Sequence, residues 1–321
     1  MLEEKIFIEV NGTQQGMFSQ SKQTENPVLL FLHGGPGSPE IAFTQDYPTG
    51  LEEIFTVCWW EQRGSGISYQ KDTTKEKMTI EQMIADTLVV TDYLRERFSR
   101  EKIYLIGHSW GTLLGMLTAQ RRPELFQAYI GIGQMSHQLE SERLAYSYML
   151  DEYRKNKHQK MIKKLEKFSI DQGGEVSTAY ISARSAGMMK LGVGFMRNCR
   201  SSMKIGSMLM RFKGYALREK VQFMRGNSFA LNCLWDEIMT IDLAKEVPEL
   251  AIPVYILHGR FDYQVSYALA QKYAQKLKAP MVGFYTFNHS AHSPCFEEAE
   301  KMCKILREDV LQNRITLADP L

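Results

Sequence analysis

The sequence has few cysteines, and none lie in a pattern that would hold a metal. Five occur among 321 residues, an odd number, and no two have the C-x-x-C spacing of a zinc or redox site. Disulfide-rich secreted domains carry paired cysteines, so we expect reduced thiols and a cytoplasmic location. The five are Cys58, Cys199, Cys233, Cys295 and Cys303.

An excess of one charge sign is also missing. The chain has 39 basic and 37 acidic residues, a formal net charge of +2. Nucleic-acid binders need a concentrated basic surface, so this balance gives no support for a nucleic-acid partner. No run of about 18 apolar residues could span a bilayer, and the segment from Met1 to Lys5 lacks the apolar core of a secretory signal. We therefore expect a soluble protein without a membrane partner.

Motifs of several cofactor and metal enzymes are absent. The chain contains no G-x-x-x-x-G-K-[ST] phosphate loop, no H-E-x-x-H zinc motif and no G-x-G-x-x-G after an expected strand. Nucleotide-dependent, zinc-protease and dinucleotide-dependent activities therefore lack their usual binding residues. We expect no cofactor and no metal, and a small molecule or short peptide as the binding partner. The sequence leaves the oligomeric state open.

What is present is the composition of an ordinary globular protein. Hydrophobic residues make up 44% of the chain and charged residues 24%, close to the averages of folded domains. With 321 residues, the chain can form one enlarged domain or a core with an inserted lobe. The first expected elements are two antiparallel strands, Lys5 to Val10 and Thr13 to Gln20. Asn11-Gly12 between them suits a tight hairpin turn.

Short apolar runs alternate with helical stretches after this hairpin. The runs are β-branched or aromatic and end in turn-forming residues, which is typical of buried strands. This alternation predicts an α/β fold with a mostly parallel sheet flanked by helices. The expected strands are Val28 to Leu32, Phe55 to Trp60, Ile103 to Ile106, Ala128 to Ile132, Pro253 to His258 and Met281 to Phe287. The expected helices are Thr79 to Phe98, Thr112 to Gln120, Ser266 to Leu277 and one from Phe296 onward.

The alternation stops near Gly133 and returns at Pro253, an interval far longer than a normal connection. Residues 134–236 hold 18 Lys/Arg against 9 Asp/Glu, and 10 of the 18 methionines. We interpret this segment as a helical cap inserted into a core of residues 1–133 and 237–321. Its methionines suit either a surface that faces substrate or ordinary helix packing. Its positive charge suits either a solvated face or an anionic ligand.

A candidate nucleophile lies directly after the expected strand Ile103 to Ile106. Gly107-His108-Ser109-Trp110-Gly111 fits G-x-S-x-G and precedes a helical stretch. This strand, turn and helix form the context of a nucleophile elbow, in which glycines on both sides let the backbone bend and present a serine hydroxyl. The pattern therefore indicates Ser109 as the nucleophile.

A serine hydroxyl needs a base to take its proton and an acid to orient that base. Asp262 follows the expected strand Pro253 to His258, and both His289 and His292 follow the expected strand Met281 to Phe287. The order nucleophile, acid, histidine is that of the α/β-hydrolase triad. Spacing alone leaves both histidines as candidates for the base.

Cleavage of an acyl group also needs backbone N–H donors for the charge that develops on the attacked oxygen. The N–H of Trp110, directly after the nucleophile, is one candidate. The second is expected from the glycine-rich loop after Val28 to Leu32, which reads His33-Gly34-Gly35-Pro36-Gly37. We select Gly35, because a residue without a Cβ lets the backbone approach closely.

These segments together resemble the proline iminopeptidase group of serine aminopeptidases, within the α/β-hydrolases. The resemblance rests on five segments in the family's order: H-G-G-P-G from His33, E-Q-R-G-S-G-I-S from Glu61, G-H-S-W-G from Gly107, H-G-R-F-D from His258 and S-A-H-S-P from Ser290. It implies an α/β-hydrolase fold with a helical cap and cleavage of an amide or ester through an acyl-enzyme.

The resemblance also implies roles for individual residues. It implies a triad of Ser109, Asp262 and His292, with Gly35 and Trp110 as oxyanion donors. It favours His292 over His289, because relatives place the base in the loop between the last core strand and a helix. We assign no chemical role to Arg63 and expect its loop to support the oxyanion loop.

The substrate is predicted less directly. In the aminopeptidases, carboxylates in or beside the cap bind the substrate's amine, and some relatives have a glutamate where this chain has Arg260. Possible replacements are Glu219, Asp236 and Glu237, although the cap's positive charge disfavours an ammonium group. The leading interpretation is an aminopeptidase of proline iminopeptidase type. The alternatives are a carboxylesterase or other small-molecule acyl hydrolase, and a non-catalytic binding protein on the same scaffold.

Overall fold

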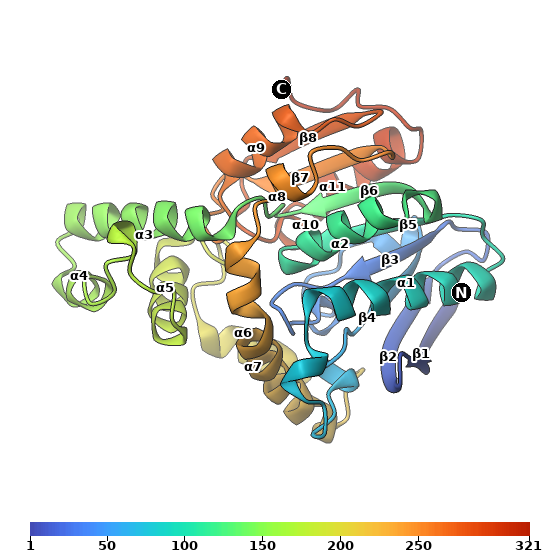
Figure 1. The fold of residues 1–321 in the computed structure, drawn as a ribbon, viewed down its shortest axis with the longest axis horizontal. Helices are drawn as coiled ribbons and strands as arrows, with labels where there is room; N and C mark the ends of the chain where they lie inside the picture. The colour runs from blue at the N-terminus through green and yellow to red at the C-terminus, as the bar shows by residue number, and fades with distance from the viewer.

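A computed structural model describes residues 1–321 and contains one eight-stranded sheet (Figure 1). The strands lie in the order β1-β2-β4-β3-β5-β6-β7-β8. Their bounds are β1 (Leu2–Val10), β2 (Thr13–Ser21), β3 (Val28–Leu32), β4 (Thr56–Trp60), β5 (Ile103–His108), β6 (Phe126–Ile132), β7 (Val254–Gly259) and β8 (Val282–Phe287). Each strand expected from the sequence is present, with ends shifted by a few residues at most.

The sheet begins with the expected hairpin. β1 pairs antiparallel with β2, and the turn residues Asn11 and Gly12 have φ angles of 45° and 76°. Positive φ at both positions is what a two-residue hairpin turn of this twist requires. β2 also runs antiparallel to β4, whereas the remaining neighbouring strands are parallel to one another. The prediction of a mostly parallel sheet is therefore confirmed.

Helices cover both faces of the sheet (Figure 1). One face packs against α1 (Ile80–Arg97), α2 (Trp110–Arg121) and α9 (Tyr267–Lys276). The other face packs against α11 (Ala299–Ile305) and a 3₁₀ helix, η1 (Glu40–Phe43). A short helix α10 (Pro294–Glu297) precedes α11. Because both faces are covered, the central strands are buried along almost their whole length, which explains their continuous apolar runs.

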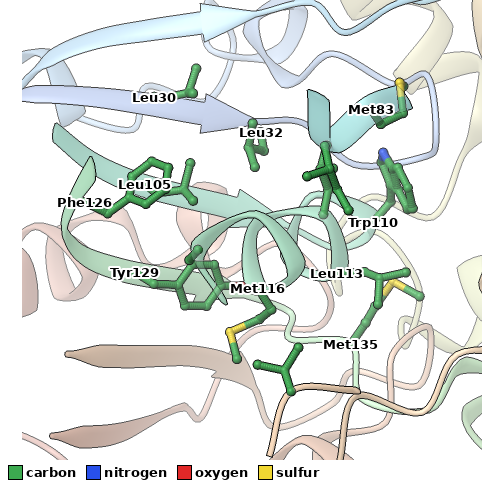
Figure 2. Close-up of a cluster of buried hydrophobic side chains, with 14 of the residues drawn as sticks. Leu30, Leu32, Met83, Leu105, Trp110, Leu113, Met116, Phe126, Tyr129 and Met135 are labelled. Carbon is green, nitrogen blue, oxygen red and sulfur yellow. The ribbon is translucent and has the colours of Figure 1, made fainter. Parts of the chain in front are cut away.

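The packing of α2 fixes the position of the turn that precedes it. Figure 2 shows Leu113 and Met116 of α2 beside Leu32 and Leu105 of the sheet, and all four side chains are almost fully buried. Trp110, the first residue of α2, is 1% exposed and belongs to the same cluster. A helix held along its buried face in this way keeps the end of β5 and the following turn in one place.

A helical insertion separates β6 from β7, and Figure 1 shows its helices α3, α4 and α5 extending away from the sheet. The expected boundary at 236/237 lies inside the longest of these helices, which continues to Thr240. The charge and methionine content on which that boundary was based does not mark where a helix ends. The helices of the insertion are α3 (Gln138–Lys155), α4 (Gln159–Leu165), α5 (Thr178–Leu191), α6 (Ser202–Arg211), α7 (Leu217–Thr240) and α8 (Leu243–Glu246).

The methionines of this insertion mostly serve packing. Among the residues that line the two cavities at Ser109, Met135 is the one methionine. Ordinary helix packing therefore accounts for more of them than a methionine-lined substrate surface does. The buried methionines of residues 134–236 are Met135, Met149, Met161, Met188, Met196 and Met208.

None of the helices in the protein has the length and apolarity needed to cross a bilayer.

Candidate functional site

Ser109 occupies a sharp bend between β5 and α2. It has φ 54° and ψ −120°, a combination that non-glycine residues rarely adopt, and it is the single residue between the strand and the helix. The expected turn was longer, from Gly107 to Gly111. A Cβ on Gly107 would lie 2.3 Å from the carbonyl oxygen of Gly111, and one on Gly111 would lie 2.0 Å from that of Leu32. Both glycines are therefore needed for the close backbone packing that creates the bend.

Asp262 and His292 lie next to each other after β7 and β8. Nδ1 of His292 is 2.7 Å from Oδ2 of Asp262, and both residues are buried. The backbone N–H groups of Gln264 and Val265 each donate to Oδ1 of Asp262 at 2.9 Å. These contacts fix the carboxylate and orient the imidazole. His289, the other candidate for the base, is exposed.

A third buried group, His258, contacts the same carboxylate. Nδ1 of His258 accepts from the backbone N–H of Gln134 at 3.2 Å, so the ring proton is on Nε2. That nitrogen lies 3.1 Å from the carbonyl oxygen of Val265 and 3.2 Å from Oδ2 of Asp262. His258 therefore presents a neutral N–H donor to the acid. The motif H-G-R-F-D contains this histidine, but the sequence gives no sign that it turns back onto Asp262.

The electrostatics of the pair follow from these contacts. Burial opposes ionisation of Asp262, but His292 and His258 together hold the pKa of the carboxyl well below its ordinary value. Burial lowers the pKa of His292 below its ordinary value of 6.5, although the Asp262 carboxylate opposes this shift. At neutral pH the pair is thus an ionised carboxylate beside a neutral imidazole.

Ser109 and His292 line one cavity of about 250 Å³, which we call the aromatic cavity. Phe43, Phe195 and Phe223 supply much of its apolar wall. Nε2 of His292 is buried and has no hydrogen-bond partner, and the Ser109 hydroxyl does not donate to it in this structure. Hydrogen bonds of this kind are often long in unliganded enzymes and shorten when substrate binds.

The backbone places the His292 ring beside the bend. The N–H of Ser109 donates to the carbonyl oxygen of Ile132 at 2.9 Å. The next residue, Gly133, has φ +59°, and a Cβ there would lie 3.0 Å from Nδ1 and Cε1 of His292. A side chain at position 133 would therefore displace the imidazole. The same short backbone segment holds the serine on one side and the histidine ring on the other.

The expected oxyanion donors lie at the same place. Gly35 and Trp110 both line the second cavity at Ser109, and the backbone N–H of neither donates to an acceptor within the protein. Gly35 has φ +113°, where a side chain would be strained, and its Cβ would lie 2.6 Å from the nitrogen of Gly37. Two N–H groups are therefore free to bind an oxygen beside Ser109.

Gln62 links the oxyanion loop to Trp110, and nothing in the sequence indicated this role. Its side-chain amide donates to the carbonyl oxygen of His33 at 3.0 Å and accepts from Nε1 of Trp110 at 2.8 Å. The loop around Arg63 does support the oxyanion loop, as expected, but through Gln62 and not through Arg63 itself. Arg63 instead forms a buried ion pair with Asp86 of α1, with Nε 2.6 Å from Oδ2. Arg63 itself therefore makes no contact with the oxyanion loop, and Gln62 supplies the support.

The second cavity has a volume of about 170 Å³ and is bounded partly by the helical insertion. Ile181, Arg184 and Trp235 of the insertion line it together with Ser109. The guanidinium of Arg184 lies 2.8 Å from the fully buried carboxylate of Glu142. This charge is therefore compensated inside the insertion, and the cavity presents no unpaired carboxylate.

The residues considered for amine recognition lie elsewhere. Glu219, Asp236, Glu237 and Arg260 line neither cavity at Ser109. Glu219 forms an ion pair with Lys5, and Oε2 of Glu237 accepts from the backbone N–H of Ile80 at 3.1 Å. Asp236 is exposed, and the guanidinium of Arg260 lies over the ring of Tyr267. None of the four is placed to bind a substrate group at Ser109.

Comparisons with known proteins agree with this architecture. The family model described as the alpha/beta hydrolase fold matches residues 27–175. A probable aminopeptidase of Bacillus subtilis, YbaC, is 34% identical over 291 residues, 91% of each chain. The chain belongs to the α/β-hydrolase family. The fold predicted from the sequence is therefore confirmed.

Other relatives place this α/β-hydrolase in the proline iminopeptidase-like group, as the sequence resemblance predicted. The proline iminopeptidase of Saccharolobus solfataricus is 22% identical over 295 residues, covering 89% of this chain and 86% of that protein. The crystal structure of the Mycobacterium smegmatis proline iminopeptidase superposes with a TM-score of 0.69 at 15% identity, covering 96% of this chain and 98% of that one. At this identity the structural likeness supports the fold alone.

Proposed function

We propose that this α/β-hydrolase is a serine hydrolase that cleaves an amide or ester bond through an acyl-enzyme. The observation that carries the proposal is the buried His292–Asp262 pair, whose Nε2 has no partner and borders the cavity that Ser109 also lines. An imidazole oriented by a carboxylate, with its second nitrogen free beside a serine, can act as a general base.

The proposed reaction has two halves. His292 takes the proton of Ser109 as its oxygen attacks the substrate carbonyl, and the N–H groups of Gly35 and Trp110 stabilise the oxyanion. The C–N or C–O bond breaks as His292 returns the proton to the leaving amine or alcohol. Water then attacks the acyl-enzyme with His292 again as base, and the carboxylic acid product leaves Ser109.

We also propose that residues 134–236 act as a cap over the site. Side chains of the insertion line both cavities at Ser109: Ile181 and Arg184 of α5 and Trp235 of α7 line the smaller one, and Phe223 and Asn227 of α7 line the aromatic cavity. A cap of this kind excludes water and selects the substrate group that fits beneath it.

The first candidate activity is that of an aminopeptidase of proline iminopeptidase type. It is supported by two relatives, the probable aminopeptidase of Bacillus subtilis and the proline iminopeptidase of Saccharolobus solfataricus. The aromatic cavity, about 250 Å³ in volume, suits one small apolar side chain or a pyrrolidine ring.

A second candidate, a carboxylesterase or other small-molecule acyl hydrolase, is favoured by the charges at the site. Glu40 is the only carboxylate among the residues that line the two cavities, and it is already paired with His108. The Arg184 guanidinium in the smaller cavity is paired with Glu142. An ammonium group would therefore find no free counter-charge, whereas an uncharged acyl group would need none.

A matched substrate panel separates the two activities. Prolyl and alanyl anilides, their N-acetylated forms and short acyl esters should be assayed with the purified protein. An aminopeptidase is expected to cleave the free-amine anilides and to lose most of its kcat/KM on N-acetylation, because acetylation removes the charged group. An acyl hydrolase is expected to cleave the esters and to be indifferent to the amine. Absence of turnover with every substrate would favour the non-catalytic alternative.

The pH profile tests the base. Because burial lowers the pKa of His292 below 6.5, the neutral imidazole persists as the pH falls through that value. With the substrate that the panel identifies, kcat/KM should therefore stay level through pH 6.5 and decline only below it. A decline centred above 6.5 would contradict His292 as the buried base.

A further inference from the structure

The proposed reaction leaves one buried ionisable pair beside the site without a role. Glu40 begins η1 and His108 ends β5, and both side chains are almost fully buried at 3% and 2% exposure. Nδ1 of His108 lies 2.6 Å from Oε1 of Glu40. Neither residue has a part in the proton transfers described above. We call Glu40 and His108 the dyad.

The dyad touches three of the four segments that supply the proposed catalytic groups. The backbone N–H of Gly34, directly before Gly35, lies 3.0 Å from Oε1 and 3.3 Å from Oε2 of Glu40. His108 directly precedes Ser109 in the chain. Nε2 of His108 lies 3.0 Å from the backbone carbonyl oxygen of His292. One pair of side chains thus joins the oxyanion loop, the nucleophile bend and the loop of the base.

The hydrogen-bond partners determine how many protons the dyad holds. The carbonyl oxygen of His292 can only accept, so Nε2 of His108 carries a proton. A contact of 2.6 Å between Nδ1 and Oε1 requires a second proton between these atoms. The dyad is therefore either an imidazolium beside a carboxylate or a neutral imidazole beside a protonated Glu40. In both forms it has no net charge.

We propose that this neutral, proton-sharing dyad positions the oxyanion loop, Ser109 and His292 relative to one another, so that Glu40 and His108 are positioning residues for the reaction. The proposal rests on the proposed serine hydrolase activity. The dyad links these three segments through a single buried pair of side chains. Catalytic groups must be held close to their productive geometry, since a displacement of about 1 Å can lower the rate roughly 100-fold.

The charge state of the dyad also suits the base. The ring centroids of His108 and His292 are 4.9 Å apart. Burial opposes a charge on His108, but the Glu40 carboxylate raises its pKa above the ordinary value of 6.5. Other ionisable groups near the pair are Asp262, His33, Tyr215 and Cys295. Burial raises the pKa of the Tyr215 hydroxyl and of the Cys295 thiol, so both are neutral. His33 is neutral because its Nε2 accepts from the N–H of Gln62 at 3.1 Å. In the imidazolium form of the dyad, the charge on His108 opposes a second positive charge on His292 and so favours the unprotonated base.

Two substitutions of Glu40 distinguish positioning from mere packing. A glutamine can donate to Nδ1 of His108 and accept from Gly34, so Glu40→Gln should keep kcat within about 5-fold of the wild type. Leucine keeps the volume but makes neither bond, so Glu40→Leu should lower kcat about 100-fold while KM changes less than about 3-fold. His108→Asn keeps a donor near Glu40 but loses the bond to His292, and it should lower kcat at least about 10-fold.

Asp309→Asn provides the matched control. Asp309 is a fully buried carboxylate that accepts hydrogen bonds from Tyr285 and Thr316, in a part of the fold distant in sequence from the bend. Its substitution is expected to lower the melting temperature and to leave kcat unchanged. A loss of kcat in Glu40→Leu that is absent in Asp309→Asn therefore reflects the site and not general destabilisation.

The outcomes separate the possibilities. Unchanged kcat in Glu40→Leu, or in His108→Asn if the leucine variant does not fold, would overturn the proposal. An equal loss of kcat in Glu40→Gln and Glu40→Leu would also overturn it. A rise in KM confined to free-amine substrates would overturn it as well, because Glu40 would then be a substrate-binding residue. Wild-type labelling by a fluorophosphonate is measured first. If the wild type is not labelled, both the serine mechanism and the proposed role of the dyad are wrong. If the wild type is labelled but kcat of the dyad variants is unchanged, only the proposed role of the dyad is wrong.

Discussion

Replacing Ser109 with alanine is expected to remove both turnover and labelling by a fluorophosphonate probe. Alanine lacks the oxygen that attacks the carbonyl, and loss of a triad member lowers the rate by about 10⁴-fold or more. The probe phosphonylates an activated serine hydroxyl, so labelling should disappear with activity. Mass spectrometry of labelled wild-type protein should place the probe on the peptide that contains Ser109.

Ser228→Ala serves as the control for this substitution. Ser228 is exposed on α7 and its hydroxyl contacts the backbone carbonyl oxygen of Met224. Its loss should change neither labelling nor turnover. The melting temperature of the Ser109 variant must be measured as well, because φ at this position is 54° and the bend tolerates few changes. Undiminished labelling of folded Ser109→Ala would show that another residue is the nucleophile.

The fold was predictable because buried parallel strands have an unusually clear sequence pattern. The run Val28 to Leu32 has no polar residue, and the structure forms β3 over the same residues. Turn-forming residues follow this strand and the others, and they set the ends of the strands. Since the carboxyl ends of parallel strands meet at one edge of the sheet, motifs directly after β3, β5, β7 and β8 were expected to meet.

Contacts between distant segments were not predictable in the same way. Glu40 and His108 are 68 residues apart, and the glutamate is not within the H-G-G-P-G loop by which the oxyanion segment was identified. Its pairing depends on the position of η1, which also brings Glu40 within hydrogen-bond distance of Gly34 in that loop. The contact of Gln62 with Trp110 and the return of His258 onto Asp262 are of the same kind. Local sequence gives no information about such contacts.

Local patterns also misled where two partners compete for one side chain. Thr79 and Gln82 have the spacing of a capping box at the start of α1. The N-cap half is present, because the hydroxyl of Thr79 accepts from the backbone N–H of Gln82 at 3.1 Å. The side chain of Gln82 instead donates to Oδ1 of Asp86 at 2.8 Å. Asp86 is the buried partner of Arg63, and a hydrogen bond donated to this ionised carboxylate is stronger than the one that the Gln82 amide oxygen would accept from the backbone N–H of Thr79.

His292→Ala and His289→Ala are expected to differ by several orders of magnitude in kcat. The sequence offered both histidines after β8, only three positions apart. In the structure the His292 ring is buried against Asp262, with Nδ1 2.7 Å from Oδ2, whereas His289 is exposed. Removing the base should cost about 10⁴-fold or more in kcat, as for the nucleophile. Removing an exposed imidazole should change kcat less than about 2-fold, since surface substitutions have small effects.

The double variant makes this comparison decisive. If Ser109 and His292 act as one unit, Ser109→Ala combined with His292→Ala should be hardly slower than either single variant, because each one alone already removes the shared proton transfer. If His292 only stabilised the fold, the loss of kcat in the double variant would be the product of the two single losses. The melting temperature would then fall whenever His292 is replaced. The reverse ranking, with His289→Ala severe and His292→Ala mild, would move the base to the exposed position. The buried contact with Asp262 would then have no part in the reaction.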